Sequence, residues 1–178
     1  MNYTRPIQAG ILLAALSAAV FAQEQSNPLS GGQKAFYSMV SGNLIAGAEE
    51  MPEADFAFKP TPEVRSFGQL VGHVADAQYL FCSIALGEKN PSPGIEKTKT
   101  AKADLVQALK DGVAYCDKAY DGMTDAQASQ IVKLFGRETA KLTVLTVNTA
   151  HSDEHYGNMV TYLRLKGLVP PSSAPRKK

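Results

Sequence analysis

The side chains best suited to chemistry in this sequence are its three histidines, His73, His151 and His155. His151 and His155 stand four residues apart in the stretch His-Ser-Asp-Glu-His. On an α-helix that spacing places both imidazoles on one face, so that they can reach a single ion, and His73 would supply a third ligand. Three neutral nitrogen ligands leave coordination positions open, which is typical of a catalytic rather than a closed structural metal site.

The same residues allow two other interpretations. A lone histidine on an apolar face is more often a hydrogen-bonded core residue, although three of them would each need a separate partner. The order His151-x-x-Glu154-His155 also matches a short inverted zinc-peptidase pattern, in which a later acidic residue completes the ligand set. Residues 156–178 contain no Asp or Glu, so the peptidase interpretation lacks its third ligand.

Two carboxylates could orient the ligating imidazoles. Asp76 follows His73 by three residues, and Glu154 precedes His155 directly. A carboxylate bound to the second ring nitrogen fixes the orientation of a ligating histidine. Both residues could equally lie on solvated helix faces, so they are candidates only. No serine or cysteine is placed by the sequence as a nucleophile, and the catalytic residues stay unassigned.

The elements that must position the histidines are predicted to be helices. Apolar residues recur at three- to five-residue steps, and capping-box pairs, Ser66 with Gln69 and Thr124 with Gln127, mark the start of the second long helix and of a short extra one. The prolines within Gly87–Thr98 make that stretch a loop. The predicted long helices cover residues 30–50, 66–86, about 105–120 and 139–166.

The last of these helices competes with a strand, because residues 142–149 are rich in β-branched side chains. We prefer the helix, since core-type residues from 142 to 163 form one continuous seam that ends at Gly167. The histidine pair then lies on or beside this seam, and His73 lies on the apolar stripe of the second helix. Metal-ligand sites are commonly built in this way from facing helices of a bundle.

Residues 1–22 are predicted to be a secretory signal peptide. Arg5 precedes an uncharged run of about 13 residues, Ala9–Phe21, with small residues where a signal peptidase cleaves. The run is too short to cross a bilayer, which takes about 20 residues, and no longer apolar run follows. We therefore expect a periplasmic or secreted protein with no membrane segment after cleavage.

The rest of the chain is expected to be one domain. Without residues 1–22 it has 156 residues, with 17 basic and 17 acidic side chains. A neutral chain without a basic run lacks the electrostatic footprint of a nucleic-acid-binding protein. We assign residues 23–29 to an N-terminal segment, 30–169 to a helical bundle and 170–178 to a disordered tail.

Several motifs resemble those of the DinB superfamily. The matching stretches are Gly72-His73-Val-Ala-Asp76, His151-Ser-Asp-Glu-His155-Tyr-Gly157 and Tyr162-Leu-Arg164-Leu-Lys-Gly167-Leu-Val-Pro170-Pro171. The resemblance extends from about residue 30 to 171. It implies an all-α four-helix bundle with up-down-down-up topology. It also implies a divalent transition metal, most often nickel or zinc, with His73, His151 and His155 as its ligands.

The resemblance also implies a choice of functions. Members of that family with known activity include thiol-dependent S-transferases and isomerases, whereas many members have no established reaction. We expect a metal-dependent hydrolase or transferase that acts on a small molecule. The alternative is a non-catalytic secreted bundle that binds a ligand or serves as a scaffold. The expected partners are a small-molecule substrate or ligand and, at most, a second copy of the chain in a homodimer.

The implied topology predicts a disulfide between Cys82 and Cys116. In a simple up-down hairpin, Cys116 would lie more than four turns from Cys82. With the second and third helices parallel, both cysteines fall near the same end of the bundle. The connecting loop, at about 3.3 Å per residue, is long enough to run the length of the bundle. An oxidising compartment would favour the bond, and free buried thiols are the alternative.

Overall fold

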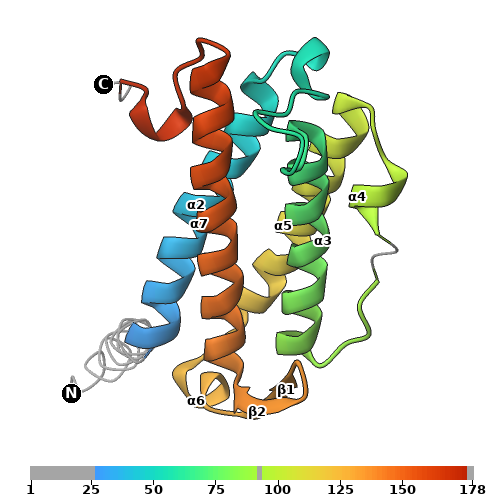
Figure 1. The fold of residues 1–178 in the computed structure, drawn as a ribbon. Coiled ribbons are helices and arrows are strands. Elements are labelled where there is room, and N and C mark those ends of the chain that lie inside the picture. The colour runs from blue at the N-terminus through green and yellow to red at the C-terminus, as the bar shows by residue number, and fades with distance from the viewer. Residues whose placement is uncertain (1–26, 92–93, 176–178) are drawn as a thin grey trace, which may run out of the picture.

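The computed structural model describes residues 27–91 and 94–175, and its long helices form a four-helix bundle. In Figure 1, the first and last of these helices run toward the end that carries the C-terminus, and the two between them run the opposite way. The course is therefore up-down-down-up. The predicted signal peptide lies outside the described residues. The long helices are α2 (Pro28–Glu50), α3 (Phe67–Leu86), α5 (Lys102–Asp121) and α7 (Lys141–Leu165).

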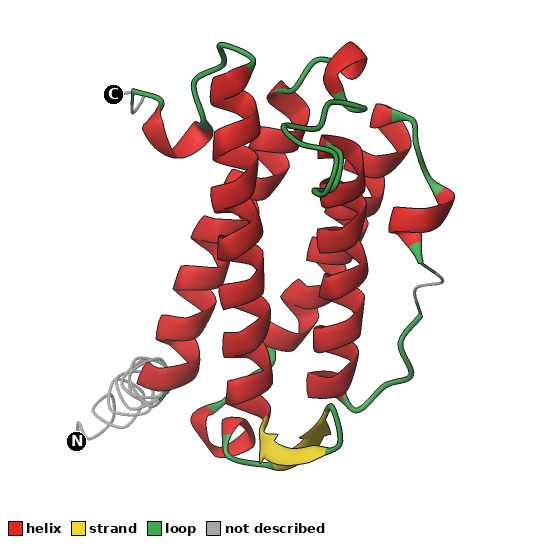
Figure 2. Ribbon diagram, viewed as in Figure 1, coloured by secondary structure: helices red, strands yellow, loops and turns green. Residues whose placement is uncertain are grey.

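Short elements connect the long helices. Figure 2 shows two strands at the end of the bundle opposite the C-terminus, where β1 (Ile131–Leu134) pairs antiparallel with β2 (Arg137–Ala140). The sequence analysis assigned no strand here, because four-residue strands are too short to show a clear alternation of apolar and polar side chains. The other short elements are η1 (Glu53–Asp55), α4 (Ile95–Thr98), α6 (Asp125–Ala128) and η2 (Pro171–Ser173).

The helix starts agree with the sequence patterns. The capping box of α3 forms, since Ser66 Oγ accepts the Gln69 N–H at 3.2 Å and Gln69 Oε1 accepts the Ser66 N–H at 2.9 Å. Thr124 and Gln127 form the same motif at α6. The strand interpretation of residues 142–149 is wrong, because the stretch is helical in α7 and buries only one face, Val144, Leu145, Asn148 and Thr149. Among the described residues, no helix combines the length and apolar character needed to span a membrane.

The connection from α3 to α5 runs along the outside of the bundle (Figure 1) and contains the short helix α4 where the sequence analysis expected only loop. Helix α4 packs very closely on α3. A Cβ atom at Gly72 would lie 2.8 Å from the Glu96 Cα, so only glycine allows this approach. The Asp76 carboxylate accepts the backbone N–H groups of Ile95 and Glu96 at 2.7 and 2.9 Å, which holds α4 against α3.

The parallel arrangement of α3 and α5 brings two cysteines together. Cys82 and Cys116 form a disulfide, with their Cα atoms 5.2 Å apart, as the sequence predicts from this topology. Both residues are fully buried. The bond therefore links the two parallel helices inside the core.

A polar network crosses the core beside the disulfide. Gln78 on α3 is fully buried, and its Oε1 accepts hydrogen bonds from Tyr37 OH and from Asn148 Nδ2, both at 3.1 Å. Gln78 Nε2 donates to Ser152 Oγ at 2.9 Å. Asn148 Nδ2 also lies 3.2 Å from Tyr120 OH. The network thus connects α2, α3, α5 and α7 through a single glutamine and a single asparagine.

The chain after α7 is more ordered than expected. The sequence analysis placed a disordered tail at 170–178, but residues 170–175 are described and include η2. Ser172 N–H donates to Tyr156 OH at 2.8 Å, and Arg164 Nη2 donates to Ser173 Oγ at 3.0 Å. These contacts hold the segment against α7. Of the predicted tail, residues 176–178 lie outside the described part.

Candidate metal centre

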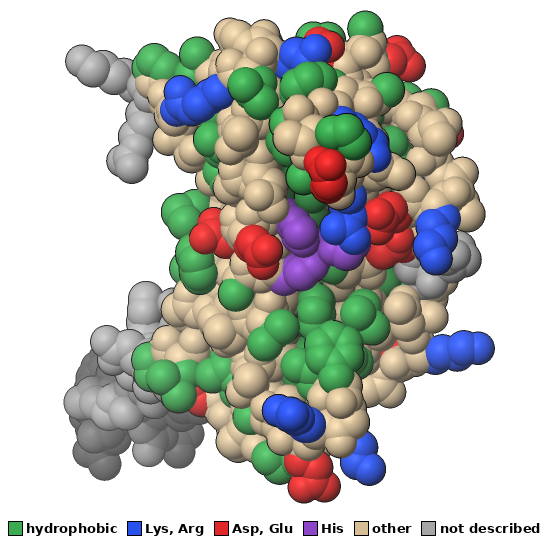
Figure 3. Space-filling view, in the orientation of Figure 1, with side chains coloured by type: hydrophobic (Ala, Val, Ile, Leu, Met, Phe, Trp, Pro, Cys, Tyr) green, Lys and Arg blue, Asp and Glu red, His purple; other side chains and the backbone are tan. Residues whose placement is uncertain are grey.

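The three histidines meet between α3 and α7. His151 Nε2 lies 3.2 Å from His73 Nε2 and 3.1 Å from His155 Nε2. One nitrogen from each ring lies within 4.8 Å of the others, a spacing that one metal ion can bridge. The space-filling view in Figure 3 shows the histidines together at the surface, in a hollow flanked by charged side chains. The structure therefore brings together all three residues that the sequence singled out.

Hydrogen bonding alone does not satisfy these nitrogens. His73 Nδ1 lies 3.0 Å from Glu96 Oε2, and a carboxylate accepts, so the proton of the neutral His73 ring is on Nδ1 and its Nε2 carries a lone pair. His151 Nε2 faces the Nε2 atoms of both other rings and has at most one proton to share between them. The far nitrogen of this ring, His151 Nδ1, is buried and has no partner in the described part of the chain. A cation would be bound by the facing lone pairs, so the residues present fit a metal.

Burial keeps two of the rings neutral. The pKa of His151 is lowered to about 4, first by burial and then by the neighbouring His73. The pKa of His155 is also lowered to about 4, first by burial and then by His151. Only a neutral imidazole has a lone pair to give to a metal. At neutral pH these two histidines are therefore ready to act as ligands.

The carboxylate that orients His73 is Glu96, a residue that no sequence pattern indicated. The predicted candidate Asp76 acts one step further out, because it holds the backbone of α4 and so positions Glu96 against His73. Glu154, the other candidate, is exposed, and its charge raises the pKa of His151 against the effect of burial. Glu96 is 23 residues from His73 in a predicted loop, so no spacing pattern in the sequence could have indicated it.

A cleft of about 720 Å³ opens onto His155 of the histidine cluster. Arg65 lies at its edge and donates through Nε to Glu96 Oε1 at 2.9 Å, so Glu96 contacts a ligand histidine with one oxygen and an arginine with the other. This cleft gives a small molecule access to the centre. The side chains around it include Arg65, Leu70, Glu96, Glu154, His155, Asn158, Thr161 and Tyr162.

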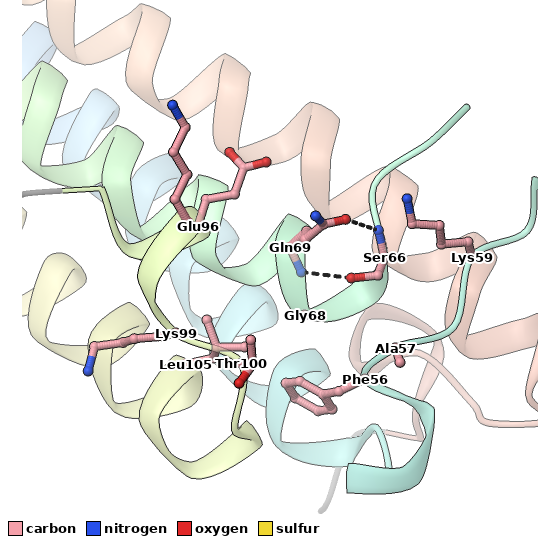
Figure 4. A pocket seen from close by; sticks show the side chains of 11 residues that line it. Phe56, Ala57, Lys59, Ser66, Gly68, Gln69, Glu96, Lys99, Thr100 and Leu105 are labelled. Carbon is pink, nitrogen blue, oxygen red and sulfur yellow. Dashed lines mark hydrogen bonds between the residues drawn. The ribbon is translucent and has the colours of Figure 1, made fainter. Parts of the chain in front are cut away.

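Glu96 also lines a second pocket, which Figure 4 shows from close by. Its floor is apolar, with Phe56 and Leu105, and the capping box that starts α3 forms one wall. Lys59 and Lys99 stand at its rim. Glu96 therefore borders both a basic pocket and the cleft at His155.

A family model identifies the chain. The model for the DinB superfamily matches residues 38–159, which include all three histidines. The chain belongs to the DinB superfamily. In this DinB protein the histidine cluster lies at the junction of α3 and α7 described above. No curated protein sequence matches it.

Solved structures share the DinB fold. A DinB-like protein from Bacillus cereus ATCC 10987 superposes with a TM-score of 0.69 at 18% identity, covering 79% of this chain and 95% of the other. A DinB-like protein from Bacillus subtilis gives 0.67 at 20% identity, with 82% and 99% covered. A mycothiol-dependent maleylpyruvate isomerase gives 0.62 at 18% identity, with 74% of this chain and 60% of that protein covered. At these identities the likeness shows the fold alone.

Proposed function

We propose that this DinB protein is a metal-dependent enzyme that carries out hydrolysis or group transfer on a small molecule. The observation that supports the proposal is the convergence of three Nε2 atoms whose hydrogen bonding cannot be completed among themselves. His73, His151 and His155 would hold a divalent transition metal. Nickel and zinc suit a set of imidazole nitrogens. When bound, such a metal lowers the pKa of a coordinated water or thiol.

The chain's own residues support this role in three ways. Glu96 fixes the orientation of His73, as outer carboxylates do for ligating histidines. Arg65 puts a positive charge beside the centre, where it can hold an anionic group of a substrate. The cleft at His155 has the size of an ordinary small-molecule site. A known relative in fold, the mycothiol-dependent isomerase, makes thiol-dependent transfer one class worth testing.

The proposed location is the periplasm or the extracellular space. The support is the charge and apolar pattern of residues 1–22 together with the buried Cys82–Cys116 disulfide. Structural disulfides persist in oxidising compartments and are rare in reducing ones. The substrate would then be a small molecule that is present in the periplasm or outside the cell.

Metal analysis of the chain from residue 23, purified without a polyhistidine tag, tests the proposal. We expect one divalent ion per chain after reconstitution with nickel or zinc, and loss of the ion in His73→Ala. The exposed neighbour Asp153 supplies a matched control, since Asp153→Ala should keep the ion. The loaded protein is then screened with hydrolytic and thiol-transfer substrates, with and without chelator.

The outcomes separate the two function classes. Turnover that disappears on chelation supports an enzyme. A protein that binds no divalent ion overturns the proposal. If the metal-loaded protein turns over none of the substrate classes but binds a ligand, it is a non-catalytic binding bundle.

A further inference from the structure

The hairpin β1–β2 carries an aromatic residue in a strained position. Leu134 pairs with Arg137, so the turn between the strands consists of Phe135 and Gly136 alone. Both have positive φ, 49° and 81°. A two-residue turn of this kind favours Asn, Asp or Gly at its first position, and a bulky side chain there is a genuine outlier. Among the described residues, Phe135 is the only one other than glycine with a positive φ.

The fold gains little from this aromatic side chain. Phe135 is 73% exposed, more than any other large apolar residue of the described part of the chain. Burial therefore does not offset the backbone strain. A strained residue that contributes little packing is a reason to look for a function.

The position of Phe135 indicates what that function is. Its ring lies 6.1 Å from the ring of Phe81, edge to face, and the Phe81 ring lies 5.7 Å from the ring of His151. The three rings therefore follow one another from the hairpin to the histidine centre, with the Phe81 ring buried and the Phe135 ring exposed. Figure 3 shows apolar side chains directly below the histidines, toward the end where Figure 1 places the hairpin.

We propose that Phe135 is a specificity-determining residue that packs against an aryl or branched alkyl group of the small molecule bound at the histidine centre. The proposal rests on the proposed function and specifies its substrate class, one with an apolar group beside the metal-binding group. The buried Phe81 ring lies between Phe135 and His151, and the exposed ring of Phe135 is the part that a bound group would contact. An exposed aromatic ring loses little conformational freedom when it binds such a group.

The test uses two probes that share a metal-binding group. Acetohydroxamate and benzohydroxamate are titrated into the cobalt-loaded protein, and the visible spectrum of the cobalt reports the dissociation constant of each. We expect the wild type to prefer benzohydroxamate. In Phe135→Asn that preference should fall about threefold to tenfold, the equivalent of one lost aromatic contact. The unfolding midpoint of this variant should stay level or rise, because Asn-Gly suits the turn better.

Two further variants act as controls. Phe135→Tyr keeps the ring and should keep the preference. Ile131→Thr removes another exposed apolar side chain of the same hairpin, 64% exposed, and should also keep it. An unchanged preference in Phe135→Asn, or a lower unfolding midpoint, overturns the inference. A wild type that fails to load cobalt overturns the proposed function as well, whereas a loaded wild type that binds both probes equally overturns this inference alone.

Discussion

The polar network around Gln78 and the histidine cluster lie next to each other between α3 and α7, yet they differ in how their polar atoms are paired. In the network, amide and hydroxyl groups alternate as donors and acceptors, and Gln78 Oε1 receives two hydrogen bonds. Only Asn148 Oδ1 is left buried without a partner. In the cluster, three Nε2 atoms face one another with too few protons to share.

This difference separates a structural role from a binding role. A buried polar group that finds its partner inside the protein contributes to one specific packing. Groups whose lone pairs converge on one point are completed only by something from outside. We therefore expect mutations in the network to change stability, and mutations in the cluster to change metal binding.

The largest effect is expected on metal affinity. His151→Ala removes the ligand that contacts both other histidines. If each ligand carries about 3–4 kcal/mol of the binding energy, the loss is about a thousandfold in affinity. Competitive titration with a chromogenic chelator measures it. A variant that keeps the affinity of the wild type would show that the cluster is not the metal centre.

The disulfide should have the next largest effect, on stability alone. Cys82 and Cys116 are 34 residues apart, and replacing both with alanine should lower the free energy of unfolding by about 3 kcal/mol. Denaturant unfolding of the metal-free proteins gives the difference. Metal affinity of the folded variant should not change. Two free thiols in unfolded, unreduced wild type would contradict the bond itself.

Breaking the polar network should lower the free energy of unfolding by somewhat less than loss of the disulfide does. Gln78→Leu removes one hydrogen bond from each of Tyr37, Asn148 and Ser152, and about 2 kcal/mol of unfolding free energy should be lost. The control is Gln107→Leu on the exposed face of α5, which should change stability by less than about 0.5 kcal/mol. Equal effects of the two substitutions would mean that the network contributes nothing specific.

The orienting carboxylate should have a smaller effect, again on metal affinity. Glu96→Gln keeps the size of the side chain but removes the charge that His73 Nδ1–H and Arg65 contact, and we expect about tenfold weaker binding. Glu154→Gln is the matched control at the rim of the same cleft and should bind the metal as the wild type does. The assignment of Glu96 fails if the two variants behave alike.

The smallest effect is a pH dependence of the metal-free protein. His151 and His155 have pKa values of about 4 in the folded protein, below the ordinary value of 6.5. The unfolded chain therefore binds more protons between these values, and stability falls as pH drops from 6.5 toward 4. Allowing for partial exposure, we expect about 1 kcal/mol or less per pH unit. Chemical unfolding at pH 7 and pH 5 measures it, and His151→Gln should reduce the slope.

Much of the fold could be predicted because its signals are local. The capping box at Ser66, the apolar seam of α7 and the i, i+4 pair of histidines each depend on spacing within one helix. The parallel course of α3 and α5 came from the family resemblance, and with it the disulfide. These features could therefore be predicted from local spacing and from the course of the helices, without information on contacts between residues distant in sequence.

The parts that escaped prediction depend on tertiary contacts. Glu96 becomes an orienting residue only because Gly72 and Asp76 hold α4 against α3. Phe135 lies in a turn whose usual residues are Asn or Gly, so no sequence pattern indicated a hairpin there. Both residues lie in connecting segments, where residue spacing says little about position.

The cross-links on α3 have a consequence for how the protein opens. The disulfide joins α3 to α5 near one end, and a metal on the histidines would join α3 to α7 near the middle. Helix α2 has neither link and is held by packing, hydrogen bonds and the exposed ion pairs Lys34–Asp121 and Glu49–Lys110. In native-state hydrogen exchange, its amides should therefore be the first of the four long helices to lose protection, before the cross-linked trio opens as a unit.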